Sequence, residues 1–291
     1  YLKAADVLIE HGALEAFHHI FYVVAISLIA LSKLIFGHAV IAFVFLQCLL
    51  SGVAALCLYR AAAFLFKDPM AGLLSAVIFI CWWDVIQWNT AVMTESIACS
   101  LICMVIVRLV YFKQRLQDYM ILSLAVIACV LTRPTGVLVV FGVSLYFFAR
   151  YWNSLKAQPF LRISLFICFA LIAFAGTTFM FSYWDLTEQY SKGNIVTYMD
   201  TIEGQRSYDK DLRLHTSNLI LPDPEWTPIH KMGYFMWHNP GHFATAATLK
   251  IYYLISGTRP YFSVLHNVYA VAWLCVIYLL FFVGTCRSGD F

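Results

Sequence analysis

Long apolar runs dominate this chain, and windows of about 20 mainly apolar residues recur from residue 39 to residue 285. A helix of that length crosses the hydrocarbon core of a bilayer, which is about 30 Å thick. The sequence therefore predicts an all-α fold, a polytopic transmembrane helix bundle of about seven spans with additional interfacial helices. The expected spans are 39–60, 70–88, 94–112, 119–132, 135–150, 162–183 and 265–285.

The segment 18–37 is also long enough to cross a bilayer, but it carries Lys33. Only Gly37 and His38 separate it from the next apolar run. We expect an interfacial or re-entrant helix here, on the outer face of the membrane. A complete span is the alternative, and it would place residues 1–17 inside.

The placement of basic residues predicts the orientation, because short cytoplasmic loops collect Lys and Arg. If 39–60 runs inward, one set of basic residues falls on the cytoplasmic side: Arg60, Lys67, Lys113, Arg115, Arg150, Lys156, Arg162 and Arg287. The amino-terminal stretch, the turn at 87–94, the break at Arg133-Pro134 and the loop 184–264 then face outward.

Three regions follow from this topology. Residues 1–183 form the transmembrane bundle, which includes N-terminal surface helices on the outer face. Residues 184–264 form a polar extracytoplasmic loop region, which ends in a semi-apolar stretch at 242–256 suited to the membrane surface. Residues 265–291 contain the last span and a cytoplasmic tail.

Composition supports a membrane location. Hydrophobic residues make up 62% of the 291 residues and charged residues only 12%, which is too little polar surface for a water-exposed protein of this size. A soluble globular protein is therefore excluded. The net charge of +3 is too small to suggest a nucleic-acid partner.

Glu95 and Arg133 are the leading candidates for chemistry, because ionisable side chains near membrane depth are costly and often functional. Glu95 begins a span at an outer turn, with Thr94 as its expected N-cap; complementing the helix dipole is the alternative role. Arg133 precedes Pro134, which breaks the helix. Its guanidinium suits a phosphate, whereas a lipid-headgroup anchor is the alternative.

Other candidates lie at the same predicted face. His18 and His19 open the segment 18–37, and we do not expect both to bind one metal ion, because neighbouring side chains on a helix diverge. Arg259-Pro260-Tyr261 and His266-Asn267 bracket the last span. These residues have two alternative roles: they contact the substrate, or they anchor the chain at the membrane interface.

Several short motifs, in order along the chain, resemble the polytopic glycosyltransferases of the GT-C fold, in the branch similar to dolichyl-phosphate-mannose protein mannosyltransferases and aminoarabinose transferases. The motifs are Tyr1…Ala4-Ala5…Gly12, Leu34-Ile35-Phe36-Gly37, Thr94-Glu95-Ser96, Thr132-Arg133-Pro134-Thr135-Gly136, Asn239-Pro240, Arg259-Pro260-Tyr261 and His266-Asn267. At the position where relatives have charged residues ahead of a Pro, this chain has Ile20 and Phe21.

The resemblance implies a transferase that moves a sugar from a polyprenyl-phosphate donor to a lipid, glycan or protein acceptor, at the extracytoplasmic face of a cell membrane, most simply a bacterial inner membrane. Glu95 corresponds to the second acidic residue of such sites and Arg133 to the donor-phosphate contact. Further substrate contacts are expected at His19, Arg259, Tyr261 and His266. A divalent metal ion, with Glu95 as its ligand, is left open as a cofactor.

In this family the leading catalytic Asp lies upstream of a residue similar to Tyr1, outside this sequence. Because the chain begins with Tyr rather than Met, we expect a fragment of a longer protein. A multi-pass transporter or flippase is the main alternative function, and a noncatalytic scaffold is a third. A transporter is expected to carry polar or broken helices at the bilayer midplane, whereas the ionisable residues here gather near one face.

Overall fold

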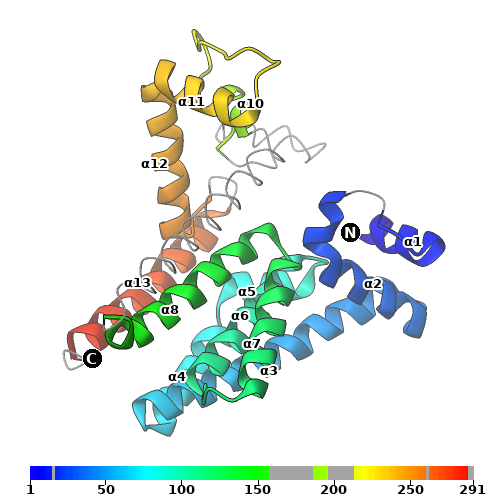
Figure 1. The fold of residues 1–291 in the computed structure, drawn as a ribbon, viewed down its shortest axis with the longest axis vertical. Coiled ribbons are helices and arrows are strands. Elements are labelled where there is room, and N and C mark those ends of the chain that lie inside the picture. The colour runs from blue at the N-terminus through cyan, green and yellow to red at the C-terminus, as the bar shows by residue number, and fades with distance from the viewer. Residues whose placement is uncertain (15–16, 157–185, 196–212, 260–261, 288–291) are drawn as a thin grey trace. The chain divides into compact units, whose positions relative to one another are not determined.

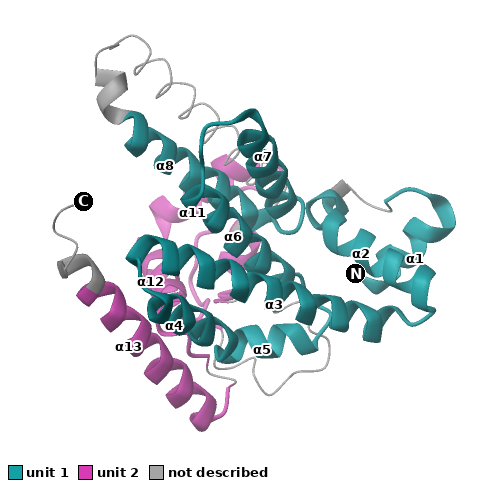
Figure 2. Ribbon diagram, turned by 90° about the horizontal axis from the view of Figure 1, so that it is seen from below, with its two compact units in different colours: residues 1–158 teal, residues 159–291 magenta. Residues whose placement is uncertain are grey.

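The computed structural model describes residues 1–14, 17–156, 186–195, 213–259 and 262–287 (Figure 1). Every regular element within these ranges is a helix, and the extended pairing there is an isolated bridge between Asn194 and Arg213. The prediction of an all-α chain is confirmed. The chain divides into two compact units, 1–158 and 159–291, which are described separately below (Figure 2).

The first unit begins with helix α1 (Leu2–His11), a 3₁₀ helix (Phe17–Tyr22) and α2 (Val23–Phe36). Both α-helices end at a glycine in the left-handed conformation, Gly12 with φ 66° and Gly37 with φ 72°, as expected of helix C-termini. The buried face of α1 packs on α2 through a cluster that includes Ala4, Ala5, Ile26 and Ile29. Helix α1 is therefore anchored to α2 by apolar contacts, and its placement on the membrane surface remains a prediction.

Helix α3 (Ala39–Phe66) has 28 residues, more than the expected span of 39–60. The next predicted span, 70–88, is instead two helices, α4 (Pro69–Ile80) and α5 (Trp83–Thr90), which bend by 53° at the break between them. Neither Pro nor Gly lies at this break, so the sequence offered no signal for it. Trp82 Nε1 donates a hydrogen bond to Asp84 Oδ2 (3.1 Å) across the break.

Helices α6 (Thr94–Val110), α7 (Leu116–Val130), a 3₁₀ turn (Pro134–Gly136) and α8 (Val137–Lys156) complete the described part of the first unit. Helix α6 runs parallel to α3: Gln47 near the start of α3 bonds to Ala91 just before α6, and Tyr111 just after α6 bonds to Arg60. Two ends of the bundle can therefore be distinguished, one at residues 89–96 and the other at residues 108–113.

Four described helical segments are long and apolar enough to cross a membrane: His18–Phe36, Ala39–Phe66, Pro134–Tyr151 and Val264–Val283. A fifth results if α4 and α5 count as one span. Helices α6 and α7, with 17 and 15 residues, are shorter than these four segments. The expected span at 162–183 lies outside the described residues. The total of seven spans and the interfacial placement of 18–37 remain predictions.

The exposed faces of these helices are strongly apolar. On α3, Ile41, Phe45 and Leu56 are 73%, 64% and 63% exposed. Continuous apolar exposure of this kind suits a hydrocarbon environment and would be unfavourable in water. The helices and their surfaces together support a polytopic membrane bundle.

The second unit contains α10 (Leu186–Ser191), α11 (Pro228–His238), α12 (Pro240–Ser256) and α13 (Val264–Arg287). Asn239, between α11 and α12, is 7% exposed, and its side chain both accepts from and donates to the backbone of Ile220 (2.9 and 2.8 Å). The semi-apolar stretch 242–256 lies within α12, and its placement along the membrane surface remains a prediction. The predicted region boundaries at 183 and 264 remain untested.

Candidate active site

Glu95 and Arg133 meet at one end of the first unit. Glu95 lies in the first turn of α6, and Arg133 follows the end of α7. Arg133 Nη1 lies 2.7 Å from Glu95 Oε1, and the two side chains are 29% and 25% exposed. The two leading candidates from the sequence are therefore an ion pair, partly shielded but still accessible.

The break before Pro134 presents the Arg133 side chain. Helix α7 ends at Val130, with Leu131 as its C-cap, and Thr132 is fully buried, with its hydroxyl donating to Ala128 O (2.6 Å). Arg133 is extended (φ −155°, ψ 147°), as the following proline requires. The 3₁₀ turn then passes so close to α7 that a Cβ at Gly136 would overlap the Cys129 carbonyl.

Glu95 is positioned differently from the expectation. Met93, not Thr94, is the N-cap of α6, and no side chain caps that end. Thr94 is instead the first helical residue, 2% exposed, and its hydroxyl lies 3.4 Å from Glu95 Oε2. The predicted N-cap role of Thr94 is wrong, because the backbone of α6 is already helical at Thr94 and the N-cap position falls on Met93.

A buried polar cluster between α3 and α6 supports the turn that leads to Glu95. The Asn89 side-chain oxygen accepts hydrogen bonds from the hydroxyls of Ser51 (2.8 Å) and Ser96. Gln47, fully buried on α3, donates to Ala91 O (2.8 Å). Polar groups buried among apolar helices fix their register strongly. This cluster therefore holds the start of α6 against α3.

Sequence reasoning did not single out this cluster. The available signal was spacing, because Gln47 and Ser51 on α3 are four residues apart, as are Ser96 and Ser100 on α6. Residues spaced by four share one helix face. In apolar spans, such pairs of small polar residues are typical of helix contacts.

Tyr1 and Tyr22 lie beside the ion pair. Their rings are 5.3 Å apart, and the Tyr1 phenol is hydrogen-bonded to Thr94. Burial raises the pKa of the Tyr1 phenol above its ordinary value; the nearby Glu95 carboxylate raises it further, whereas the Thr94 bond and Arg133 act in the opposite direction. The phenol therefore remains neutral and able to form hydrogen bonds at physiological pH.

The first residues of α2 also approach the end of α7. The backbone N–H of Val24 donates to Leu131 O (3.2 Å), two positions before Arg133. The rings of His18 and His19 contact each other, with centroids 4.3 Å apart. The candidate His19 thus belongs to the same unit as Glu95 and Arg133, in the segment that precedes α2.

The remaining candidates belong to the second unit. Arg259 is held by backbone carbonyls, with Nη1 donating to Tyr253 O (2.5 Å) and Thr258 O (2.7 Å). His266 stacks on Phe262, with ring centroids 3.8 Å apart. Tyr261 lies outside the described residues. The proposed substrate contacts of all three remain predictions.

The residues around Glu95 do not fit a metal ion well. Within the part of the chain that the structure describes, no three His, Cys, Asp or Glu side chains come together as a ligand group. One Glu95 oxygen is already bound to the Arg133 cation, which would compete with a metal. A divalent ion at Glu95 remains an untested prediction, and no chemical step is built on it.

The helical fold and the ion pair define a polytopic membrane protein with a charged site at one end of its bundle. The sequence model of the dolichyl-phosphate-mannose-protein mannosyltransferase family matches residues 23–176, more than half of the chain, and the chain belongs to this family. Its members are membrane glycosyltransferases that depend on polyprenyl-phosphate sugars. Neither curated proteins nor solved structures gave a match.

Proposed function

We propose that this protein transfers a sugar from a polyprenyl-phosphate carrier to a lipid, glycan or protein acceptor at the extracytoplasmic face of the membrane. The observation that carries the proposal is the ion pair between Glu95 and Arg133. It lies at the bundle end opposite Lys113 and Arg115, and the distribution of basic residues predicts that these two residues are cytoplasmic.

Arg133 is suited to the donor phosphate. A guanidinium has five N–H donors, and one Nη group is directed at Glu95. Its Nε is buried and has no hydrogen-bond partner among the described residues. During transfer the bond between the sugar and the phosphate oxygen breaks, and its electron pair stays on the phosphate. Arg133 would stabilise this developing charge.

Glu95 is suited to the acceptor side of the reaction. Its carboxylate is a quarter exposed and held by Arg133 and Thr94, so it has a defined position at the site. The acceptor oxygen must lose its proton when it attacks the sugar carbon, and a carboxylate within hydrogen-bond reach can take that proton. The same carboxylate would keep the Arg133 guanidinium aligned before the donor binds.

The test uses the full-length protein, purified in detergent and incubated with a radiolabelled polyprenyl-phosphate sugar and a membrane extract. Transfer of label should fall by about 10²-fold or more in Glu95→Gln and in Arg133→Ala. Arg133→Lys retains a cation but not the planar donors, and should retain part of the activity.

Lys33→Ala is the matched control, because it removes an exposed ion pair of similar length (2.6 Å to Asp6) elsewhere in the same unit. It should leave transfer unchanged. Full activity in both site variants would contradict the site assignment. Movement of labelled donor across sealed vesicles without any glycosyl product would support a transporter instead.

A further inference from the structure

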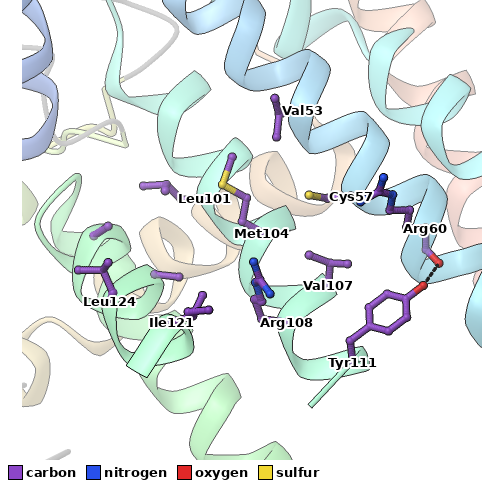
Figure 3. Close-up of a pocket in the computed structure, with 12 residues that line it drawn as sticks. Val53, Cys57, Arg60, Leu101, Met104, Val107, Arg108, Tyr111, Ile121 and Leu124 are labelled. Carbon is purple, nitrogen blue, oxygen red and sulfur yellow. Dashed lines mark hydrogen bonds between the residues drawn. The ribbon is translucent and has the colours of Figure 1, made fainter. Parts of the chain in front are cut away.

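A second feature of the first unit extends from the middle of the bundle to the end opposite the ion pair. Helices α3, α6 and α7 line an open cavity of about 740 Å³, a volume within the range of ligand pockets (Figure 3). Its walls are largely apolar and include Val53, Leu101, Met104 and Leu124. Val53 and Leu124 are 46% and 69% exposed, so the cavity opens on the lipid-facing surface of the bundle.

Two arginines line the same cavity. Arg60 lies in the last third of α3, and Arg108 lies two residues before the end of α6. Figure 3 shows Arg60 and Cys57 on one side of the cavity and Arg108 on the neighbouring helix. Tyr111, which also lines it, donates its hydroxyl to Arg60 O (3.0 Å) and so ties the end of α6 to α3.

Neither guanidinium forms an ion pair with a carboxylate among the described residues. A single long basic side chain near a helix end often extends to the lipid headgroups. Here two exposed arginines line one apolar cavity, and their combined positive charge attracts an anion. The two arginines therefore favour an anionic ligand, and the apolar walls favour one that carries a hydrocarbon chain.

We propose that this cavity binds an anionic phospholipid of the cytoplasmic leaflet, with the phosphate between Arg60 and Arg108 and an acyl chain along the apolar wall. The basic residues near this end, Lys113 and Arg115, predict that it lies at the cytoplasmic surface, where anionic lipids attract basic groups. The site is separate from Glu95 and Arg133, and the proposal does not depend on the glycosyltransferase activity.

Native mass spectrometry of the full chain in detergent, titrated with phosphatidylglycerol or phosphatidylcholine, tests this proposal. We expect the protein to bind phosphatidylglycerol about tenfold or more tightly than phosphatidylcholine, because charge-assisted hydrogen bonds to the phosphate are combined with the net lipid charge. The double variant Arg60→Ala/Arg108→Ala should abolish this preference. Lys113→Ala removes a neighbouring charge that does not line the cavity, and should preserve it.

A second variant guards against a folding defect in the arginine variants. Leu124→Trp fills the cavity from an exposed position on α7 and should reduce binding of both lipids while the unfolding temperature is retained. Equal affinity for the two lipids in the wild type, or equal loss of the preference in Lys113→Ala, would overturn the proposal. Displacement of phosphatidylglycerol by millimolar inorganic phosphate would also overturn it, in favour of a site for free phosphate.

Discussion

Glu95 Oε1 and Arg133 Nη1 lie 2.7 Å apart, although one residue begins α6 and the other follows the end of α7. The pair therefore exists only when these two helices are packed. Both side chains are about a quarter exposed, so the charges are neither fully hydrated nor sealed from a substrate. A pair in such a position can contribute to stability and to binding, and the two contributions can be separated.

A charge swap separates the contribution of the ion pair to stability from its contribution to binding. The variants Glu95→Gln and Arg133→Ala should show a coupling free energy of unfolding of about 1 kcal/mol in a double-mutant cycle, a modest value because both groups retain solvent contact. The exchange Glu95→Arg/Arg133→Glu should recover most of the stability but no glycosyl transfer, since the cation has left its position. Thermal unfolding in detergent and the label-transfer assay measure these two quantities. Recovery of transfer in the swap would disprove a position-specific role for Arg133.

Asn89 should matter more for the site than its position on a short helix suggests. Its side-chain oxygen accepts from Ser51 and Ser96, so Asn89→Ala leaves both hydroxyls without that acceptor. We expect a loss of about 1–3 kcal/mol in unfolding free energy and a parallel loss of transfer, because α6 carries Glu95. The control Thr90→Ala alters an exposed neighbour and should have little effect. Equal effects of the two substitutions would contradict this role.

Gly136 should tolerate no side chain. A Cβ there would overlap the Cys129 carbonyl, so Gly136→Ala must displace the 3₁₀ turn that follows Arg133. We expect a destabilisation of about 1–3 kcal/mol and reduced transfer. Gly142→Ala is the matched control: it lies in α8, where an added Cβ meets nothing within 4 Å, and should stabilise the helix by about 0.5–1 kcal/mol. Thermal unfolding of both variants distinguishes steric overlap from a general effect of replacing glycine.

The orientation of the first unit can be measured by cysteine labelling in intact cells, in a chain whose native cysteines are replaced. Thr90→Cys, at the end that bears the ion pair, should react with a membrane-impermeant maleimide added outside. Lys113→Cys, at the other end, should react only after the membrane is permeabilised. Both positions are exposed. The reverse pattern would place Glu95 and Arg133 on the cytoplasmic face and refute an extracytoplasmic site.

Local signals in the sequence predicted much of the helical organisation. Gly37 ends α2, and Pro134 ends the run of α7, because a left-handed glycine and a proline act within a few residues of the chain. The bend between α4 and α5 had no such signal. The N-cap prediction for Thr94 failed because α6 begins one residue earlier than expected, with Met93 as the N-cap.

By itself, the sequence determined the membrane environment, the helical class and the family, because apolar run length, charge placement and short motifs are properties of the chain alone. Only the tertiary structure decided that Arg133 pairs with Glu95, that Asn89 supports α6, and that Arg60 and Arg108 line one cavity. Each of these depends on how helices distant in sequence rotate and pack against one another. Hydropathy places a residue along a helix axis, but the partner it faces is selected by side-chain packing between helices.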